Sequence, residues 1–360
     1  MREAASEATS LEPREKRNTP LTSDARRLLE LARASGLGDQ PDDVLQWRDR
    51  EVGVAGTETE TPFLADVLRW EGSVRRDRGR TSDAEPFYHR SLAIATRLGY
   101  EAGCAHALNC LASLAQRRGD ILGTGNLLTD ALARADRSGE KRLVGMVQQN
   151  LGIIADIRGN PAAALAHYRL SLRIFDAIHD LQASSWVLNN LGYLHVKEGR
   201  YADAREAFDR ALEIAQTRGD LMSEGIIEEN RAELGLILGR TTEAYASVCR
   251  ALEIAELRGD GIRRAAALKQ RGAYERLMGR PADAVESLRV AMTLSAVGED
   301  ALLGAETLYQ YGLALYATGD NEGAADVWKS ALDAFERIAA HQWVGRVRQR
   351  LSRGGTSRYL

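Results

Sequence analysis

Apolar side chains recur at helical spacing along most of this chain, and a glycine separates each pair of apolar segments. The clearest copy of the pattern lies between Trp186 and Asp220. Its apolar residues around Gly199 are Leu188, Leu191, Tyr193, Ala204, Phe208, Ala211, Leu212 and Ala215. This spacing predicts two amphipathic helices that are joined by a turn at Gly199.

The same unit returns with a constant step of forty residues. The glycines that mark the step are Gly79, Gly119, Gly159, Gly199, Gly239, Gly279 and Gly319. A period this regular indicates stacked repeats and argues against a single closed core. We therefore predict an all-α solenoid of about seven helical hairpins with capping helices at its ends.

Small and large residues alternate in register with the marker glycines. Five residues after each marker stand Ala84, Thr124, Ala164, Ala204, Ala244, Ala284 and Ala324. Seven residues before each marker stand Gly72, Ala112, Gly152, Gly192, Ala232, Gly272 and Gly312, and nine after it stand Tyr88, Leu128, Tyr168, Phe208, Val248, Leu288 and Trp328. Small residues let two helices approach closely, so these positions predict helix crossings where large side chains interlock with small ones.

These residues carry a family resemblance. Leu191-Gly192, Gly199, Ala204, Phe208 and Ala211-Leu212 resemble the tetratricopeptide (TPR) signature, and other copies match it from about residue 64 to 338. A TPR unit is usually about 34 residues long, and a forty-residue length alone favours HEAT repeats. The paired small positions and the Leu-Gly step favour TPR, which implies a right-handed superhelix.

The forty-residue form of the repeat is similar to two particular groups of TPR proteins. Its endings, such as the segment from Ala215 to Asp220, resemble the spindle-orientation adaptors whose repeats contain Leu-Gly-Asn. They also resemble the sensor domains of bacterial STAND-type transcription activators. The match has departures, because Arg231 and Arg271 replace the leucine and Thr124 replaces the crossing alanine.

The pattern divides the chain into four segments. We expect residues 1–22 to be disordered because they are polar, and residues 23–61 to form a degenerate pair of cap helices followed by a loop. The seven-repeat solenoid then covers 62–341, and 342–360 form a capping helix with a basic tail. Four apolar residues share one face of that last helix: Trp343, Val344, Val347 and Leu351.

Composition narrows the classes of partner. The formal net charge is −3, from 48 basic and 51 acidic residues, so we expect neither nucleic acid nor a membrane as a partner. No apolar stretch is long enough to span a membrane or to act as a signal peptide. The 3 cysteines are too few and too scattered for a disulfide framework. Together these features favour a cytoplasmic protein.

No residue pattern indicates an enzyme, a metal site or a cofactor site. Cys104, His106 and Cys110 are close in sequence, but a helix turns about 100° per residue, so they point in different directions. The chain contains neither a phosphate-binding glycine loop nor an HExxH motif. The arginines between Gly345 and Arg358 suit either an anionic partner or a solvated capping helix.

A column of side-chain amides is the best candidate for a binding site. Nine residues before the marker, five consecutive repeats carry Asn150, Asn190, Asn230, Gln270 and Gln310. The TPR resemblance implies that the first helix of each hairpin lines the concave surface. An amide has both a donor and an acceptor, so a row of amides can pair with the backbone of an extended peptide. Alternatively, each amide bonds to a neighbouring helix and meets no ligand.

Apolar neighbours complete the predicted ligand-binding site. Trp186, Tyr193, Met146 and Ile226 lie about one helical turn from the amides and are suited to a peptide's side chains. We therefore predict a non-catalytic scaffold or adaptor that binds a protein or peptide segment in the concave groove. The alternative is a regulatory sensor, in which a peptide or small molecule changes the twist of the solenoid.

Overall fold

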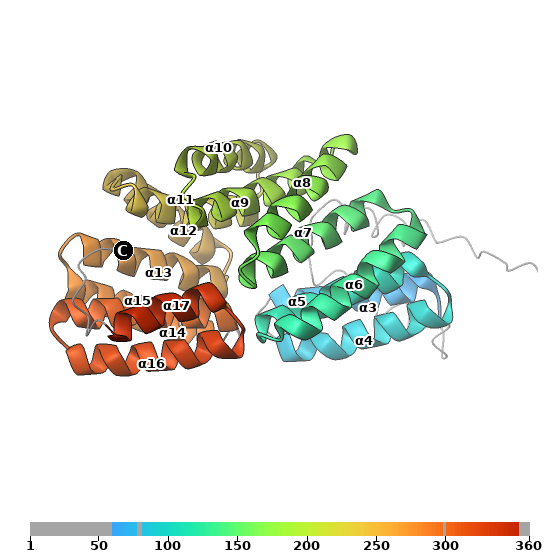
Figure 1. The fold of residues 1–360 in the computed structure, drawn as a ribbon. Coiled ribbons are helices and arrows are strands. Elements are labelled where there is room, and N and C mark those ends of the chain that lie inside the picture. Colours follow the sequence, from blue (N-terminus) through green and yellow to red (C-terminus); the bar gives the residue numbers. More distant parts are fainter. Residues whose placement is uncertain (1–59, 78–80, 298–299, 353–360) are drawn as a thin grey trace, which may run out of the picture.

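The computed structural model describes residues 60–77, 81–297 and 300–352, and within these ranges it contains fifteen α-helices and no strand (Figure 1). Seven hairpins follow one another: α3 (Pro62–Asp77) with α4 (Thr81–Arg97), α5 (Glu101–Arg117) with α6 (Ile121–Ser138), α7 (Lys141–Ile157) with α8 (Pro161–Ala177), α9 (Leu181–Lys197) with α10 (Tyr201–Arg218), α11 (Leu221–Ile237) with α12 (Thr241–Leu257), α13 (Gly261–Leu277) with α14 (Pro281–Val297), and α15 (Ala301–Thr318) with α16 (Asn321–Arg337). A last helix, α17 (His341–Ser352), follows. The all-α solenoid is confirmed. The expected disordered segment, the cap helices before residue 60 and marker Gly79 lie outside the described residues.

Left-handed turns separate the helices about every twenty residues. In the described part of the chain, ten glycines have a positive φ, and they include Gly119, Gly199 and Gly219. The residue after such a glycine caps the next helix in several copies, as where the Asp220 carboxylate accepts a hydrogen bond from the Ser223 N–H at 3.1 Å. Glycine suits this backbone because it has no Cβ to collide with the following carbonyl.

Two turns adopt the same backbone without glycine. His179 has a φ of 56° and Ala339 a φ of 53°. We expect His179→Gly to raise the free energy of unfolding by up to about 1 kcal/mol, because it relieves the left-handed strain and His179 is exposed. Urea denaturation measures the change. Gly219→Ala is the reciprocal control, because Gly219 has a φ of 66° and open space around it. This variant should lower the free energy of unfolding by a similar amount.

The predicted interlocking of small and large residues is confirmed. A Cβ added to Gly192 on α9 would lie 2.5 Å from Cε1 of Phe208 on α10, and one on Gly152 would lie 2.5 Å from Cε1 of Tyr168. Ala204 is fully buried at the same crossing. Each first helix that carries glycine here therefore offers a bare backbone patch that the large side chain of the second helix covers; these glycines are Gly72, Gly152, Gly192, Gly272 and Gly312.

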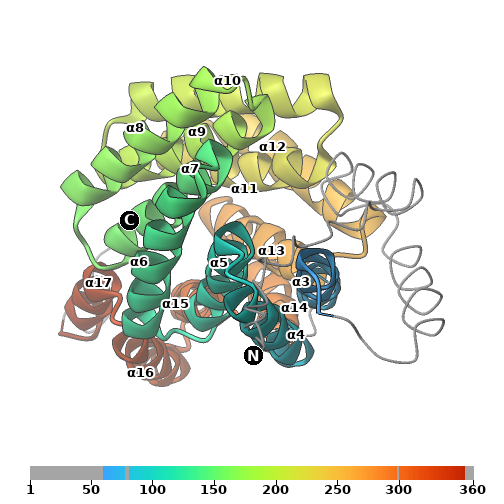
Figure 2. The same cartoon turned by 90° about the vertical axis from the view of Figure 1, so that its right-hand side faces the viewer.

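The odd-numbered helices form the inner layer of the superhelix. Each of them contacts the next odd-numbered helix as well as its own hairpin partner. Figure 2 shows the hairpins curving around, so that the C-terminal helices come back towards the N-terminal ones. We call the faces of α3, α5, α7, α9, α11, α13 and α15 that point into this curve the inner face.

The curve brings the two ends of the solenoid into contact. A Cβ on Gly119, in the turn between α5 and α6, would overlap Cγ2 of Ile338, in the turn between α16 and α17. A Cβ on Gly159 would lie 3.7 Å from Cγ of Gln342. We call this contact the seam; in Figure 1 it lies where α5 and α6 meet the C-terminal helices. Beside it, α17 buries Val344 and Val347 against the last hairpin.

Candidate binding surface on the inner face

Three of the five predicted amides bond to a neighbouring inner helix. Asn150 Nδ2 donates to Asn109 Oδ1 at 2.8 Å, and Asn230 Nδ2 donates to Asn189 Oδ1 at 2.9 Å. Gln270 Nε2 donates to Glu233 Oε2 at 3.2 Å. These three side chains link successive repeats. They fit the alternative in which each amide bonds to a neighbouring helix and meets no ligand.

The other two amides each keep a buried polar atom without a partner. Within residues 60–77, 81–297 and 300–352, Asn190 Nδ2 on α9 donates to no atom, and Gln310 Oε1 on α15 accepts from none. A buried polar group that makes no hydrogen bond costs about 1–3 kcal/mol. The inner face therefore contains one amide donor and one amide acceptor without a partner among the described residues, and both atoms are shielded from solvent in this conformation.

The four predicted apolar contacts are half-buried on three consecutive inner helices, α7, α9 and α11. Trp186 Nε1 donates to Ser223 Oγ at 2.7 Å, which fixes the indole against the next repeat. Lys197 Nζ lies 4.9 Å from the centre of the Tyr193 ring, and Met146 Sδ accepts from Arg142 at 3.4 Å. Ile226 occupies the equivalent place on α11.

Charge pairs are buried between successive repeats on the inner face, and the sequence alone did not reveal them. Lys197 bonds to Asp156 at 2.8 Å, and Lys269 bonds to Glu306. Asn150–Asn109, Asn230–Asn189 and Lys197–Asp156 are each 41 residues apart. A scan for complementary residues one repeat plus one position apart would have found these three pairs.

Opposite parts of the inner face come close together. Burial raises the pKa of the Tyr193 phenol well above its ordinary value, and the negative charges of Glu306, Glu233 and Asp156 raise it further, while Arg346 opposes them. Tyr193 belongs to α9, Glu306 to α15 and Arg346 to α17, so helices from the middle and the end of the chain act on one hydroxyl.

Glu229 on α11 makes stability depend on pH. Burial raises the pKa of its carboxyl to about 7, although Arg263 at 3.2 Å and Lys269 partly counter this. The native state therefore keeps a proton that the unfolded chain loses near pH 4.5, so stability falls as pH rises from about 4.5 to about 7. Urea denaturation across this range should show a steeper fall for the wild type than for Glu229→Gln. Equal slopes would contradict the assignment.

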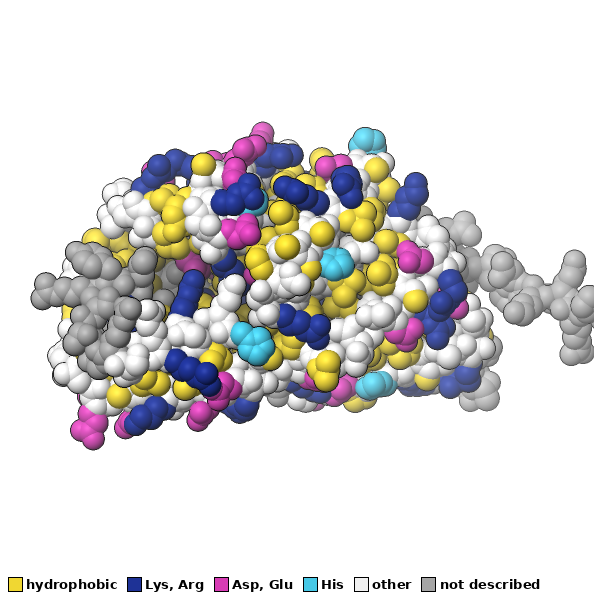
Figure 3. Space-filling model, in the orientation of Figure 1, with side chains coloured by type: hydrophobic (Ala, Val, Ile, Leu, Met, Phe, Trp, Pro, Cys, Tyr) yellow, Lys and Arg dark blue, Asp and Glu magenta, His cyan; other side chains and the backbone are white. Residues whose placement is uncertain are grey.

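Charges of both signs are interspersed on the exterior. On the face drawn in Figure 3, lysine and arginine side chains alternate with acidic and hydrophobic ones. In the described part of the chain no helix is long and apolar enough to cross a membrane. Within the same residues, no group of three or more histidine, cysteine or acidic side chains could hold a metal ion.

Stacked antiparallel hairpins with small residues at each crossing define a helical-repeat protein. Two family models agree with this class, both described as tetratricopeptide repeat, over residues 103–177 and 185–218. The chain is a tetratricopeptide repeat protein. A search of curated protein sequences gave no match. The likenesses to spindle adaptors and STAND-type sensors stay predictions.

Solved structures share the fold at low sequence identity. A Rap protein complexed with Competence and Sporulation Factor has a TM-score of 0.63 and 12% identity, with 92% of this chain and 96% of that one covered. Aspartyl phosphate phosphatase F from Bacillus subtilis has a TM-score of 0.57 and 14% identity, with 94% and 82% covered. The APC/C hetero-tetramer Cut9-Hcn1 has a TM-score of 0.61 and 14% identity; the match covers 90% of this chain and 56% of that one. At these identities the likeness shows the fold alone.

Proposed function

We propose that this chain is a non-catalytic protein-interaction scaffold that holds an extended peptide segment along its inner face. The observation that carries the proposal is the pair of unpartnered amide atoms, the Asn190 Nδ2 donor and the Gln310 Oε1 acceptor. An extended peptide backbone presents a carbonyl and an N–H that complement them, whatever its side chains. Families built from TPR repeats are generally non-catalytic scaffolds, which supports the same reading.

The surroundings of these two amides suit the side chains of a short peptide. Trp186, Tyr193, Met146 and Ile226 supply half-buried apolar surface on adjacent helices. Large aromatic side chains contribute disproportionately to binding in protein interfaces. The Rap protein of the same fold is complexed with Competence and Sporulation Factor, which is consistent with a ligand of this kind.

The test is selection of short random peptides displayed on phage against the purified chain. We expect the wild type to enrich a peptide family, and Asn190→Ala combined with Gln310→Ala to lose at least about tenfold in affinity for it, since each lost hydrogen bond is worth about 1 kcal/mol. The melting temperature should not fall, because neither amide atom bonds to the scaffold. A peptide family that binds the double variant equally well would refute the proposal.

Asn150→Ala is the matched control. This variant breaks the 2.8 Å bond to Asn109, so it should lower stability by about 1 kcal/mol. We expect it to reduce peptide affinity less than the double variant does. A larger loss of affinity in the control would place the binding determinant in the bonded amides.

A second candidate function, regulatory sensing, is favoured by the seam. The unpartnered atoms of Asn190 and Gln310 are shielded from solvent, so a peptide gains access to them when the superhelix opens, and the contact of Ile338 with Gly119 resists opening. Binding would then change the pitch of the solenoid, which an effector protein could detect. Small-angle X-ray scattering with and without the selected peptide tests this: an increased radius of gyration supports sensing, and an unchanged one contradicts sensing by opening of the superhelix.

A further inference from the structure

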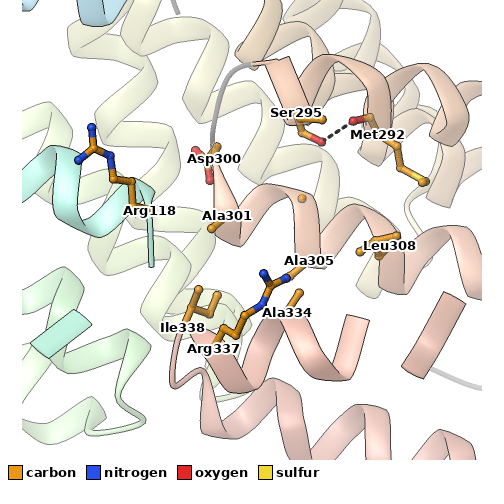
Figure 4. A pocket seen from close by; sticks show the side chains of 12 residues that line it. Arg118, Met292, Ser295, Asp300, Ala301, Ala305, Leu308, Ala334, Arg337 and Ile338 are labelled. Atoms are coloured by element: carbon orange, nitrogen blue, oxygen red, sulfur yellow. Dashed lines mark hydrogen bonds between the residues drawn. The ribbon is translucent and has the colours of Figure 1, made fainter. Parts of the chain in front are cut away.

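A separate cavity lies at the seam, away from the amide column. Its volume is about 380 Å³, and its walls come from α14, α15 and α16 together with Arg118 at the end of α5 (Figure 4). The apolar wall consists chiefly of Met292, Ala301, Ala305, Leu308, Ala334 and Ile338. The cavity therefore joins the second repeat to the last two.

The cavity includes the space left where one column of the repeat loses its large side chain. Fifteen residues after the marker, five repeats carry Ile94, Ile174, Ile214, Ile254 and Leu294, the second repeat carries Arg134, and the last carries Ala334. In the fifth repeat Ile254 fills the space against α11, where a Cβ on Gly225 would lie 3.1 Å from its Cγ2. The residue equivalent to Gly225 in the last repeat is Ala305, which lines the cavity with Ala334. Isoleucine has three more carbon atoms than alanine, so alanine at this place contributes part of the open space.

A second position of the last repeat also carries a smaller residue than its equivalents, and this enlarges the same space. Gly304 stands fifteen residues before the last marker, where the two preceding repeats carry Arg264 and Glu224. Gly304 lines the cavity, and a Cβ added to it would approach no atom closer than Ser295 Oγ at 3.9 Å. In the last repeat, two neighbouring positions, Gly304 and Ala334, therefore carry smaller side chains than in the preceding repeats, and both residues line the cavity.

The polar groups at the cavity favour an anion. Ser295 Oγ already donates to the Met292 carbonyl at 3.0 Å, and the Asp300 carboxylate caps α15 by accepting from Leu303 N–H at 3.0 Å. Arg337 has no carboxylate partner among the described residues, since its guanidinium donates only to the Asp333 carbonyl at 3.4 Å. Figure 4 shows the Arg337 side chain reaching between Ala305 and Ala334. On the far side, Arg118 pairs with Glu85 at 2.8 Å.

We propose that this cavity binds a small, largely apolar molecule with one anionic group, such as a medium-chain carboxylate. The apolar part would lie among Met292, Ala305 and Leu308, and the carboxylate would pair with Arg337. Its volume falls in the range of about 300–1,000 Å³ that is usual for small-molecule sites. Since Arg118 belongs to the second repeat, the bound molecule also fills the gap at the seam.

Calorimetric titration of the full chain with decanoate tests the site. We expect saturable binding of one molecule per chain. Ala334→Ile restores the side chain that other repeats carry, so it should reduce affinity at least about tenfold by filling the cavity. The same variant should raise the melting temperature without ligand, because it buries new apolar surface. Unsaturable binding, or equal affinity in a folded Ala334→Ile variant, would overturn the proposal.

Arg337→Gln tests the charge independently and leaves the core untouched. This variant should weaken decanoate binding about two- to fivefold, as expected for an ion pair with an exposed arginine, and leave decanol binding unchanged. Arg289→Gln is the matched control, because Arg289 is exposed, bonds to Glu286 and does not line the cavity. Equal decanoate affinities in Arg337→Gln and the wild type would overturn the assignment of the anionic end.

Discussion

Lys269→Met is expected to lower the free energy of unfolding by about 3–5 kcal/mol at neutral pH. Lys269 is nearly buried on the inner face, where it bonds to Glu306, and both side chains are at most 13% exposed. Burial alone lowers the pKa of its ammonium, yet the charges of Glu306 and Glu233 raise it overall. Methionine matches the length of the stem but leaves these carboxylates without their cation.

Two control variants separate this effect from the change in side-chain shape. Lys329→Met removes a charge from a pair with Asp326 whose side chains are 66% and 68% exposed, and we expect a change of at most about 0.5 kcal/mol. Lys269→Met combined with Glu306→Leu removes both buried partners and should recover much of the lost stability. Chemical denaturation measures all four proteins. A Lys269→Met variant as stable as Lys329→Met would contradict the assignment of a buried charge pair.

Gly192→Ala is expected to destabilise the protein by about 2–3 kcal/mol, because its Cβ would lie 2.5 Å from the ring of the fully buried Phe208. Phe208→Val alone should cost about 2–4 kcal/mol by leaving a cavity. The fifth repeat already carries the combination Ala232 with Val248 at these two positions. The double variant Gly192→Ala with Phe208→Val should therefore be more stable than the sum of the single effects implies.

A double-mutant cycle measures this coupling. We expect an interaction free energy of about 1–3 kcal/mol in favour of the double variant, the range found for residues in contact. The control cycle pairs Gly192→Ala with Leu288→Val in the sixth repeat, where no contact joins the two positions, and it should be additive. Additivity in the Gly192–Phe208 cycle would mean that the helices move apart instead of interlocking.

The amide column shows how far a repeat pattern predicts a site. The pattern placed Asn150, Asn190 and Asn230 at equivalent positions on successive first helices, and the structure has them there. It did not reveal that Asn150 and Asn230 bond to Asn109 and Asn189, because those partners lie outside the column. Whether a ligand meets Asn190 stays a prediction, which the peptide selection tests.

The buried charges show what the repeat pattern does not predict. The sequence places Lys197, Lys269, Asp156 and Glu229 on first helices, but it does not show which of these charges pair. Pairing depends on the distance between neighbouring inner helices and on how deeply each side chain is buried. The raised pKa of Glu229 follows from burial in the assembled superhelix, and composition carries no information about it.

The sequence by itself determined the helical hairpins, their number within the described chain and the interlocking crossings, because a forty-residue period and small residues at fixed places specify local packing between adjacent helices. Only the tertiary structure decided that Ile338 reaches Gly119 and that the missing side chain at Ala334 leaves a cavity beside Arg118. The physical reason is that a small rotation at every repeat accumulates along the solenoid. Contacts between its ends depend on the sum of all the rotations, and no single repeat encodes that sum.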